Sequence, residues 1–359
     1  MLELDCIERS FSCTGWNRAR VRFLARFVVA LLAAQTVCLS RLCVLFPSTA
    51  MAESCYKRMQ RFLKSFDFDF ESLARLLVQV AGVTPPWTLA LDRTNWKLGK
   101  ANLNILMLCV VHERIAFPLL WTVLEKKGSK GRGKAGNSNT AERIALLKRF
   151  VETFGTEKVD FVCADREFVS GEWLKWLKQA GISFRLRLRS DVLVTNGRGE
   201  EVCADWLFRD CPVQQERSLG VRRLLGHRLF VSGTRLPDGD FLIVISDKDF
   251  TLADYALRWG IETMFAAFKS RGFRLEDTHI TCPERLSRLL GLLAVAFCWA
   301  FSAGNWLTQA KPLKLKKHGR PPVSRVRRGL DFLRPVAAKL CKIPDIAQCR
   351  QALQFLSCT

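Results

Sequence analysis

Residues 87–92 read WTLALD, an apolar run that follows Pro85 and Pro86 and ends on an acid. A second apolar run, residues 159–164, also ends on an acid, Asp165. Short apolar runs bounded by turn residues are typical of buried strands. Segments with the apolar spacing of helices alternate with strand-like runs through this part of the chain, which predicts an α/β fold.

The surrounding sequence supplies the other elements of this fold. Strands are predicted at residues 105–112, 115–123, 182–188 and 241–246, and helices at residues 140–154, 171–180 and 252–270. Residues 190–240 are less regular, so we interpret them as a β-rich insertion. The chain is thereby divided into a basic helical N-terminal DNA-binding region (1–84), the first part of the core (85–189), the insertion (190–240), the rest of the core (241–305) and a basic C-terminal region (306–359).

The chain carries a large positive charge. Its 56 Lys and Arg residues outnumber 34 Asp and Glu residues, which gives a formal net charge of +22. Such an excess favours a polyanionic partner, because neutralising phosphates releases condensed counterions. Nucleic acid is the favoured partner, and a solvated basic surface or an anionic membrane contact is the alternative. Two basic segments, residues 126–134 and 311–328, are candidate phosphate contacts or plain solvated surface.

The cysteines and the apolar segments point to a cytoplasmic protein without a membrane span. None of the 14 cysteines forms a C-x-x-C pair, so most are expected to be buried free thiols. The apolar stretch at residues 21–46 is interrupted by Arg26, Gln35 and Arg41. A buried amphipathic helix therefore fits this stretch better than a spanning helix.

Two acids follow the buried strands, Asp92 after the first run and Asp165 after the second. A carboxylate at a strand end of an α/β sheet projects into the crevice where ligands usually bind. Either acid alone is weak evidence, because Asp is common where strands become turns.

The predicted helix at residues 252–270 carries a third acid on a polar face. Tyr255, Arg258, Glu262 and Lys269 fall within an arc of roughly 60° on a regular helix. A chance polar face is the alternative. Three carboxylates without a His or Cys cluster suit Mg²⁺ or Mn²⁺ better than zinc. Two such ions would activate water or a 3′-hydroxyl and stabilise the leaving oxygen, which is phosphodiester chemistry.

These segments together resemble a known family. The stretch LALDRTNW around Asp92, the stretch VCADREF around Asp165 and the pattern Tyr255-x2-Arg258-x3-Glu262-x6-Lys269 resemble the insertion-sequence-four family of bacterial DDE transposases. The last pattern matches the tyrosine-arginine-glutamate-lysine signature of that family in both residues and spacing. The resemblance covers roughly residues 22–333.

The resemblance implies a ribonuclease H-like core interrupted by a β-strand insertion. It implies that Asp92, Asp165 and Glu262 hold two Mg²⁺ ions, which Mn²⁺ can replace, and that Tyr255, Arg258 and Lys269 hold phosphates. Proteins of this kind cut the inverted repeats of their own element, pass through a DNA hairpin and join the ends to target DNA. Double-stranded DNA, a homodimer in the synaptic complex and a place at the bacterial nucleoid are expected accordingly.

Four further residues are candidate DNA contacts. Arg93 and Asn95 follow Asp92, and Arg166 follows Asp165, so each can hold DNA or orient a carboxylate. Trp259, beside Arg258, is the best candidate for stacking on a flipped base, although a core Trp is an equal alternative. The place of such an aromatic residue in the insertion stays open.

Two other functions are compatible with these residues. A metal-dependent endonuclease of the same fold would cut DNA without joining it. A catalytically inactive DNA-binding regulator derived from a transposase would bind DNA without cutting it. All three candidate acids are present, which disfavours the regulator.

Overall fold

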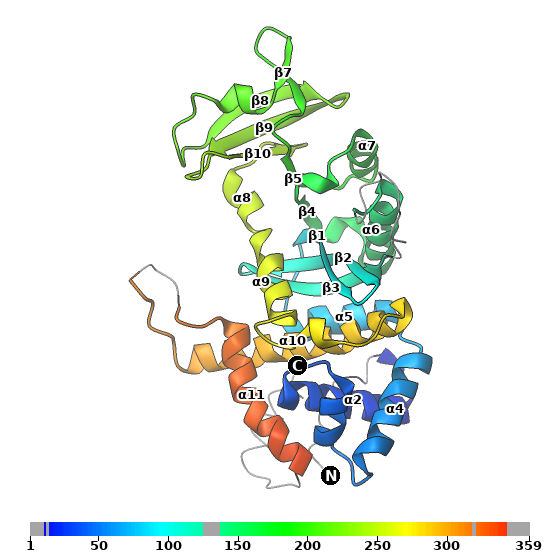
Figure 1. The fold of residues 1–359 in the computed structure, drawn as a ribbon. Helices are drawn as coiled ribbons and strands as arrows, with labels where there is room; N and C mark the ends of the chain where they lie inside the picture. Colours follow the sequence, from blue (N-terminus) through cyan, green and yellow to red (C-terminus); the bar gives the residue numbers. More distant parts are fainter. Residues whose placement is uncertain (1–10, 12–13, 125–136, 318–320, 343–359) are drawn as a thin grey trace.

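The computed structural model describes residues 11, 14–124, 137–317 and 321–342. The basic segment at residues 126–134 lies outside the described residues. Figure 1 shows three layers along the long axis of the molecule: a small β-rich part, a central sheet flanked by helices, and a helical body that contains both ends of the described chain.

The central sheet has eight strands in the order β3-β2-β1-β4-β5-β10-β9-β8, and β6 pairs with β7 in a separate ribbon. The strands are β1 Trp87–Leu98, β2 Ala101–His112, β3 Ile115–Val123, β4 Val159–Ala164, β5 Phe184–Leu188, β6 Leu193–Thr195, β7 Glu201–Cys203, β8 Arg217–Leu224, β9 His227–Arg235 and β10 Phe241–Ser246. Strands β1 to β3 are antiparallel, whereas β4 pairs in parallel with both β1 and β5. This arrangement of three antiparallel strands followed by parallel ones confirms the predicted α/β class with a ribonuclease H-like core.

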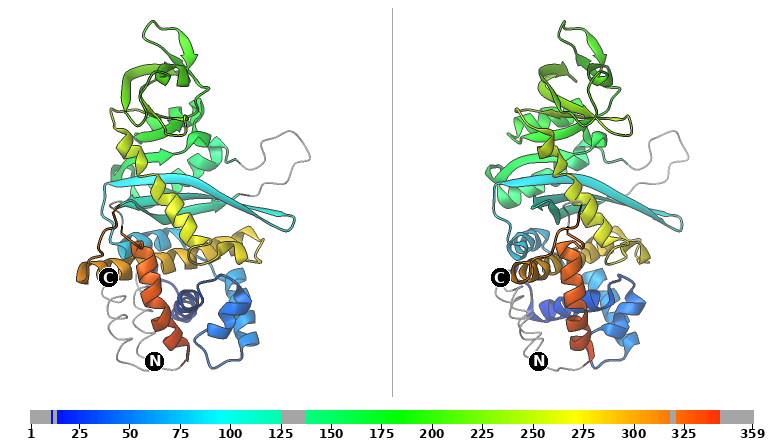
Figure 2. Two further views of the ribbon diagram at one scale, coloured as in Figure 1. Left: turned by 60° about the vertical axis from the view of Figure 1, so that its left-hand side comes forward. Right: turned by 90° about the vertical axis from the view of Figure 1, so that its left-hand side faces the viewer.

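Helices cover both faces of this sheet and build the helical body. The α-helices are α2 Arg18–Ala34, α3 Leu39–Leu42, α4 Ala52–Ser65, α5 Phe70–Ala81, α6 Thr140–Phe154, α7 Gly171–Gln179, α8 Leu252–Ala256, α9 Trp259–Phe268, α10 Pro283–Ala310 and α11 Arg325–Lys342. Short 3₁₀ turns are η2 Cys43–Leu45, η3 Thr156–Lys158, η4 Arg166–Phe168, η5 Asp205–Phe208 and η6 Leu275–Asp277. Figure 2 shows α9 crossing the long β1–β2 hairpin on the face opposite α6.

Strand β1 is longer than predicted, and the insertion adds two strands to the central sheet. Strand β1 does not end before Asp92 but continues to Leu98, because its antiparallel pairing with β2 runs on to the Leu98–Ala101 pair. Gly99 makes the hairpin turn with a left-handed φ of +57°. Within the insertion, β8 and β9 are not separate from the core, because β9 pairs with β10 and so extends the central sheet.

The helical body is organised around α10. This 28-residue helix is long and apolar enough to cross a membrane, but 89% of its apolar window is buried within the protein. The pair Arg18–Ala34 and Leu39–Leu45 also passes that test of composition, with a bend of 100° between its two parts. Strand β3 and helices α2, α5 and α11 pack against α10, so its apolar surface faces protein.

Two glycines let α10 and α11 pack at backbone distance. A Cβ added to Gly304 would lie 1.8 Å from the carbonyl oxygen of Arg325, and one added to Gly329 would lie 1.7 Å from that of Ala300. No side chain fits in that space, so α10 and α11 can approach each other this closely only at glycines. This crossing holds the C-terminal helix α11 against the rest of the helical body.

Candidate active site

The register of two parallel strands brings Asp92 and Asp165 together. Leu91 of β1 is the partner of Ala164 of β4 in the last pair of their parallel ladder. Each Asp is the next residue, and neighbouring strands lie about 4.8 Å apart. Asp92 lies in the middle of β1 rather than at its end, so the predicted strand end is wrong for Asp92. Its pairing with β4 does end there, because β4 stops at Ala164.

Arg258 joins Glu262 to this pair of acids. Its Nη1 donates a hydrogen bond to Asp92 Oδ2 at 3.1 Å, and its Nη2 donates one to Glu262 Oε1 at 2.5 Å. The Arg258 side chain is only 6% exposed, whereas that of Glu262 is 56% exposed. The guanidinium therefore forms a bridge between a carboxylate of the sheet and a carboxylate of helix α9.

The polar helix face predicted for residues 252–270 is divided between two helices. Around Arg258 the backbone tightens to 3₁₀-type bonds, since Gly260 N donates to the Leu257 carbonyl oxygen and Ile261 N to that of Arg258. Tyr255 therefore lies in α8 and Glu262 in α9, and the single regular helix of the prediction is wrong.

Close packing accompanies this change of helical geometry. A Cβ added to Gly260 would lie 3.0 Å from both the Arg114 carbonyl oxygen and the Ala116 amide nitrogen. The start of α9 thus rests directly on the turn between β2 and β3. This contact places the first turn of α9, which contains Glu262, above the sheet that carries Asp92.

Tyr255 is buried in the protein core, and Lys269 forms an ion pair within the protein. The Tyr255 side chain is buried beside Phe161 and Cys163, and its hydroxyl has no hydrogen-bond partner among the described residues. Burial raises the pKa of the Tyr255 hydroxyl far above its usual range. Lys269 Nζ forms an ion pair with Glu276 Oε1 at 2.9 Å and donates to the Asn95 carbonyl oxygen at 3.3 Å.

The electrostatics of Asp92 and Asp165 suit a cation. Burial is the main cause that raises the pKa of Asp92 to about 6, and the nearby Asp165 and Glu167 add to it, against the Arg93 amide and Arg258. Asp165 Oδ1 is buried without a hydrogen-bond partner in the described chain, and Arg187 Nη1 is 3.9 Å from it. Buried carboxylate oxygens of this kind are the donors that Mg²⁺ and Mn²⁺ prefer.

The third carboxylate is held apart from the other two. In the described residues, no three His, Cys, Asp or Glu side chains come together closely enough to hold a metal ion. Arg258 pairs with both Asp92 and Glu262 in this arrangement and offsets one of their two negative charges. Asp92 and Asp165 thus fit one side of a metal site, and Glu262 would complete it only after the Arg258 bridge opens.

The remaining predicted contacts surround the acids. Arg93 makes two hydrogen bonds to Glu167, Nε to Oε1 and Nη2 to Oε2, each at 3.0 Å. Arg166 is exposed and lines a shallow groove of about 460 Å³ with Glu167. Asn95 is exposed, and Trp259 is 60% exposed, so a core role for Trp259 is excluded.

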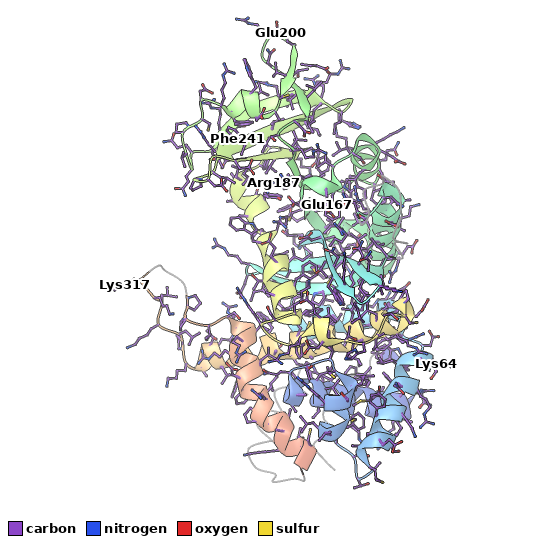
Figure 3. All side chains as sticks on the ribbon, in the orientation of Figure 1. Lys64, Glu167, Arg187, Glu200, Phe241 and Lys317 are labelled. Carbon is purple, nitrogen blue, oxygen red and sulfur yellow. The ribbon has the colours of Figure 1, made fainter. Side chains whose placement is uncertain are left out.

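Sequence reasoning missed Arg187, and it named Glu167 only as a polar neighbour of Asp165 able to hold DNA or orient a carboxylate; Figure 3 labels both residues. Glu167 orients Arg93, and its position two residues after Asp165 was the available signal. Arg187 reaches Asp165, but within the alternating FRLRL strand nothing distinguishes it from a surface arginine.

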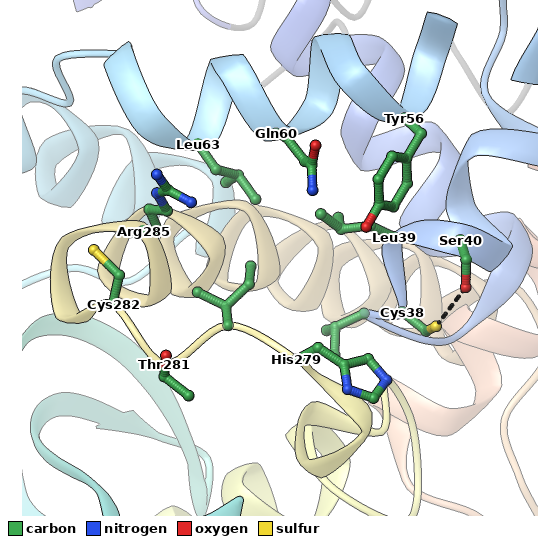
Figure 4. A pocket seen from close by; sticks show the side chains of 12 residues that line it. Cys38, Leu39, Ser40, Tyr56, Gln60, Leu63, His279, Thr281, Cys282 and Arg285 are labelled. Atoms are coloured by element: carbon green, nitrogen blue, oxygen red, sulfur yellow. Dashed lines mark hydrogen bonds between the residues drawn. The ribbon is translucent and has the colours of Figure 1, made fainter. Parts of the chain in front are cut away.

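A pocket of about 190 Å³ in the helical body contains none of the predicted site residues. It lies between α3, α4 and the start of α10, where Figure 4 shows Tyr56, Gln60, His279 and Arg285 around it. The candidate site is therefore the group of residues around Asp92 and Asp165 and not this pocket.

Asp92→Asn is expected to make the protein more stable at pH 7, because the buried carboxylate resists ionisation. The folded pKa of about 6 lies above the ordinary value near 3.8. The unfolded chain therefore loses this proton first as pH rises, and the wild type loses stability between about pH 4 and about pH 6. Urea unfolding of both proteins from pH 4 to 7 checks this. A stability difference that does not grow with pH would contradict it.

Comparisons with known proteins bear on this arrangement. A family model described as "Transposase DDE domain" matches residues 85–299. The piggyBac transposase, in a synaptic complex with hairpin DNA, is similar at 13% identity and a TM-score of 0.49, over 95% of this chain and 76% of that chain. The C-terminal lobe of a budding yeast Argonaute is similar at 13% identity and a TM-score of 0.21, over 80% and 63%. No curated protein matches. Because the family match spans more than half of the chain, this protein belongs to the transposase DDE domain family.

Proposed function

We propose that this transposase cuts the terminal inverted repeats of its own insertion sequence and joins the freed ends to target DNA. The single observation that carries the proposal is the placement of Asp92 and Asp165 side by side at the last parallel pair of β1 and β4. Glu262 is tied to the same place through Arg258. The match to the insertion-sequence-four signature supports the finer assignment to that family.

In this proposal the three carboxylates of Asp92, Asp165 and Glu262 hold divalent ions of the Mg²⁺ type, two per site. Bound ions would supply an activated water or 3′-hydroxyl and neutralise the leaving oxygen. The chain supplies the geometry: β1 and β4 fix two ligands on a rigid sheet, and the first turn of α9 brings the third.

Arg258 has two successive partners in this proposal. Without metal or DNA, its guanidinium pairs with both Asp92 and Glu262 and offsets one of their two negative charges. With divalent ions held by these carboxylates, the guanidinium would be available to a phosphate oxygen of the cut strand, a ligand that its planar fork suits. A DNA hairpin intermediate, a homodimer on paired ends and a bacterial cytoplasmic location complete the proposal.

The test uses purified protein with labelled DNA that carries the terminal sequences flanking its own gene, and a scrambled terminus as the matched control. With Mg²⁺ we expect hairpinned or joined products from the native terminus only, and none with chelator. Equal cutting of both DNAs would identify a nuclease instead. Selective binding without any cutting would identify a regulator.

A further inference from the structure

Five arginines gather in one groove of about 420 Å³ at the edge of the helical body. Three segments far apart in sequence build it: the end of α2 with α3, the loop that follows α9, and helix α11. The arginines of this groove, called the arginine groove below, are Arg41, Arg271, Arg274, Arg327 and Arg334. The fold therefore collects charges that are scattered along the chain.

Most of this charge has no counterpart in the protein. Arg327 forms an ion pair with Asp331, with Nη2 and Oδ1 2.8 Å apart. The side chains of Arg41, Arg271 and Arg334 are exposed and form no ion pair within the described residues. Like charges held together repel one another unless an anion lies between them. The arginine groove is thus built for an anionic ligand.

An unsatisfied donor lines the same groove. Gln35 ends α2 in a left-handed conformation with a φ of +51°, and it lines the groove beside Arg41. Its side-chain Nε2 is buried and has no acceptor among the described residues. A buried donor without an acceptor is costly, and an oxygen of a bound anion would satisfy it.

The arginine groove begins where helix α9, which carries Glu262, ends. Ser270 and Arg271 line it, and they follow Lys269, the cap of α9. Glu262 lies six residues before the end of α9 at Phe268, which is roughly 9 Å along a helix. One strand of duplex DNA rises about 3.4 Å per nucleotide. Along the axis of α9, the groove thus begins roughly the length of three nucleotides from Glu262.

We infer that the arginine groove binds the phosphodiester backbone of the DNA duplex next to the cleaved end, an inference that rests on the proposed function. A single small phosphate would need two or three donors, whereas this groove spreads five guanidinium groups over three segments. Exposed arginines along an open groove suit a continuous backbone, which they hold without reading its sequence.

The test is Arg271→Gln with Arg334→Gln in the full chain, measured as binding of labelled end DNA over a salt series. Each lost phosphate contact lowers the slope of log affinity against log salt by about 0.9, so a decrease near 2 is expected. We expect binding to weaken roughly 10-fold to 100-fold at low salt. The matched control, Lys175→Gln with Arg198→Gln, removes the same charge from α7 and from the β6–β7 hairpin beside Glu200 (Figure 3).

Equal binding and equal salt slopes for the groove variant and the control would overturn the inference. The variant Arg271→Lys with Arg334→Lys keeps both charges and should largely restore binding. If it does not, the inference is overturned as well. The proposed function fails separately, because it requires cutting and joining by the wild type, whereas this test reads only binding.

Discussion

Asp165→Asn is expected to lower the rate of end-DNA cleavage by roughly three orders of magnitude or more while end-DNA binding stays near wild type. The change removes one negative charge from the place where the last parallel pair of β1 and β4 puts two carboxylates together. An amide is a far weaker ligand for a hard cation than a carboxylate. Single-turnover cleavage with Mg²⁺, alongside a gel-shift measurement, separates the two effects.

Asp160→Asn is the matched control for this change. Asp160 lies near the other end of β4, before Asp165, and its side chain is exposed. It should cleave at the wild-type rate. An Asp165→Asn protein that keeps most of its cleavage activity would remove Asp165 from the metal site, and a parallel loss of binding would make its role structural.

Arg258→Ala is expected to reduce the rate of end-DNA cleavage at least about 100-fold. Its effect on the stability of the fold should be smaller. The guanidinium contacts both Asp92 and Glu262, so its removal leaves Asp92 without its arginine partner and frees the Glu262 side chain. The phosphate contact proposed for the cut strand is lost as well. Cleavage rates and urea unfolding, measured on the same preparation, compare the two consequences.

Arg258→Lys refines this prediction. Lysine keeps the charge but cannot bridge two carboxylates with a planar fork, so cleavage should stay well below wild type. Restoration of cleavage by lysine would show that charge alone matters at this position. Equal losses of stability and activity in Arg258→Ala would assign Arg258 a purely structural role.

Local signals in the sequence were sufficient to predict features that depend on a single helix or strand. The helix predicted at residues 140–154 is α6, and its start is fixed locally, because Asn139 accepts from the Glu142 amide while the Glu142 side chain accepts from the Asn139 amide. The strand at residues 159–164 could be predicted in the same way, because most of its residues are apolar and an acid follows it. These signals placed Asp165 correctly at a strand end.

Features that depend on distant partners could not be predicted in this way. Strand β1 continues past Asp92 because β2 pairs with it, and α8 separates from α9 where Gly260 meets the turn at Arg114. The bridge from Arg258 to Asp92 spans 166 positions of sequence. The periodicity of one helix contains no information on contacts with distant residues. It therefore predicted the polar face, but neither the separation of α8 from α9 nor the pairing of Arg258 with Asp92.

The most direct test of the central claim measures joining rather than cleavage. Pre-cut terminal DNA with a free 3′-hydroxyl is incubated with a target plasmid and Mg²⁺, using wild type, Glu262→Gln and, as control, Glu172→Gln on the exposed first turn of α7. The account predicts joined products from wild type and the control, and none from Glu262→Gln. Joined products from Glu262→Gln, or their absence from wild type, would contradict it.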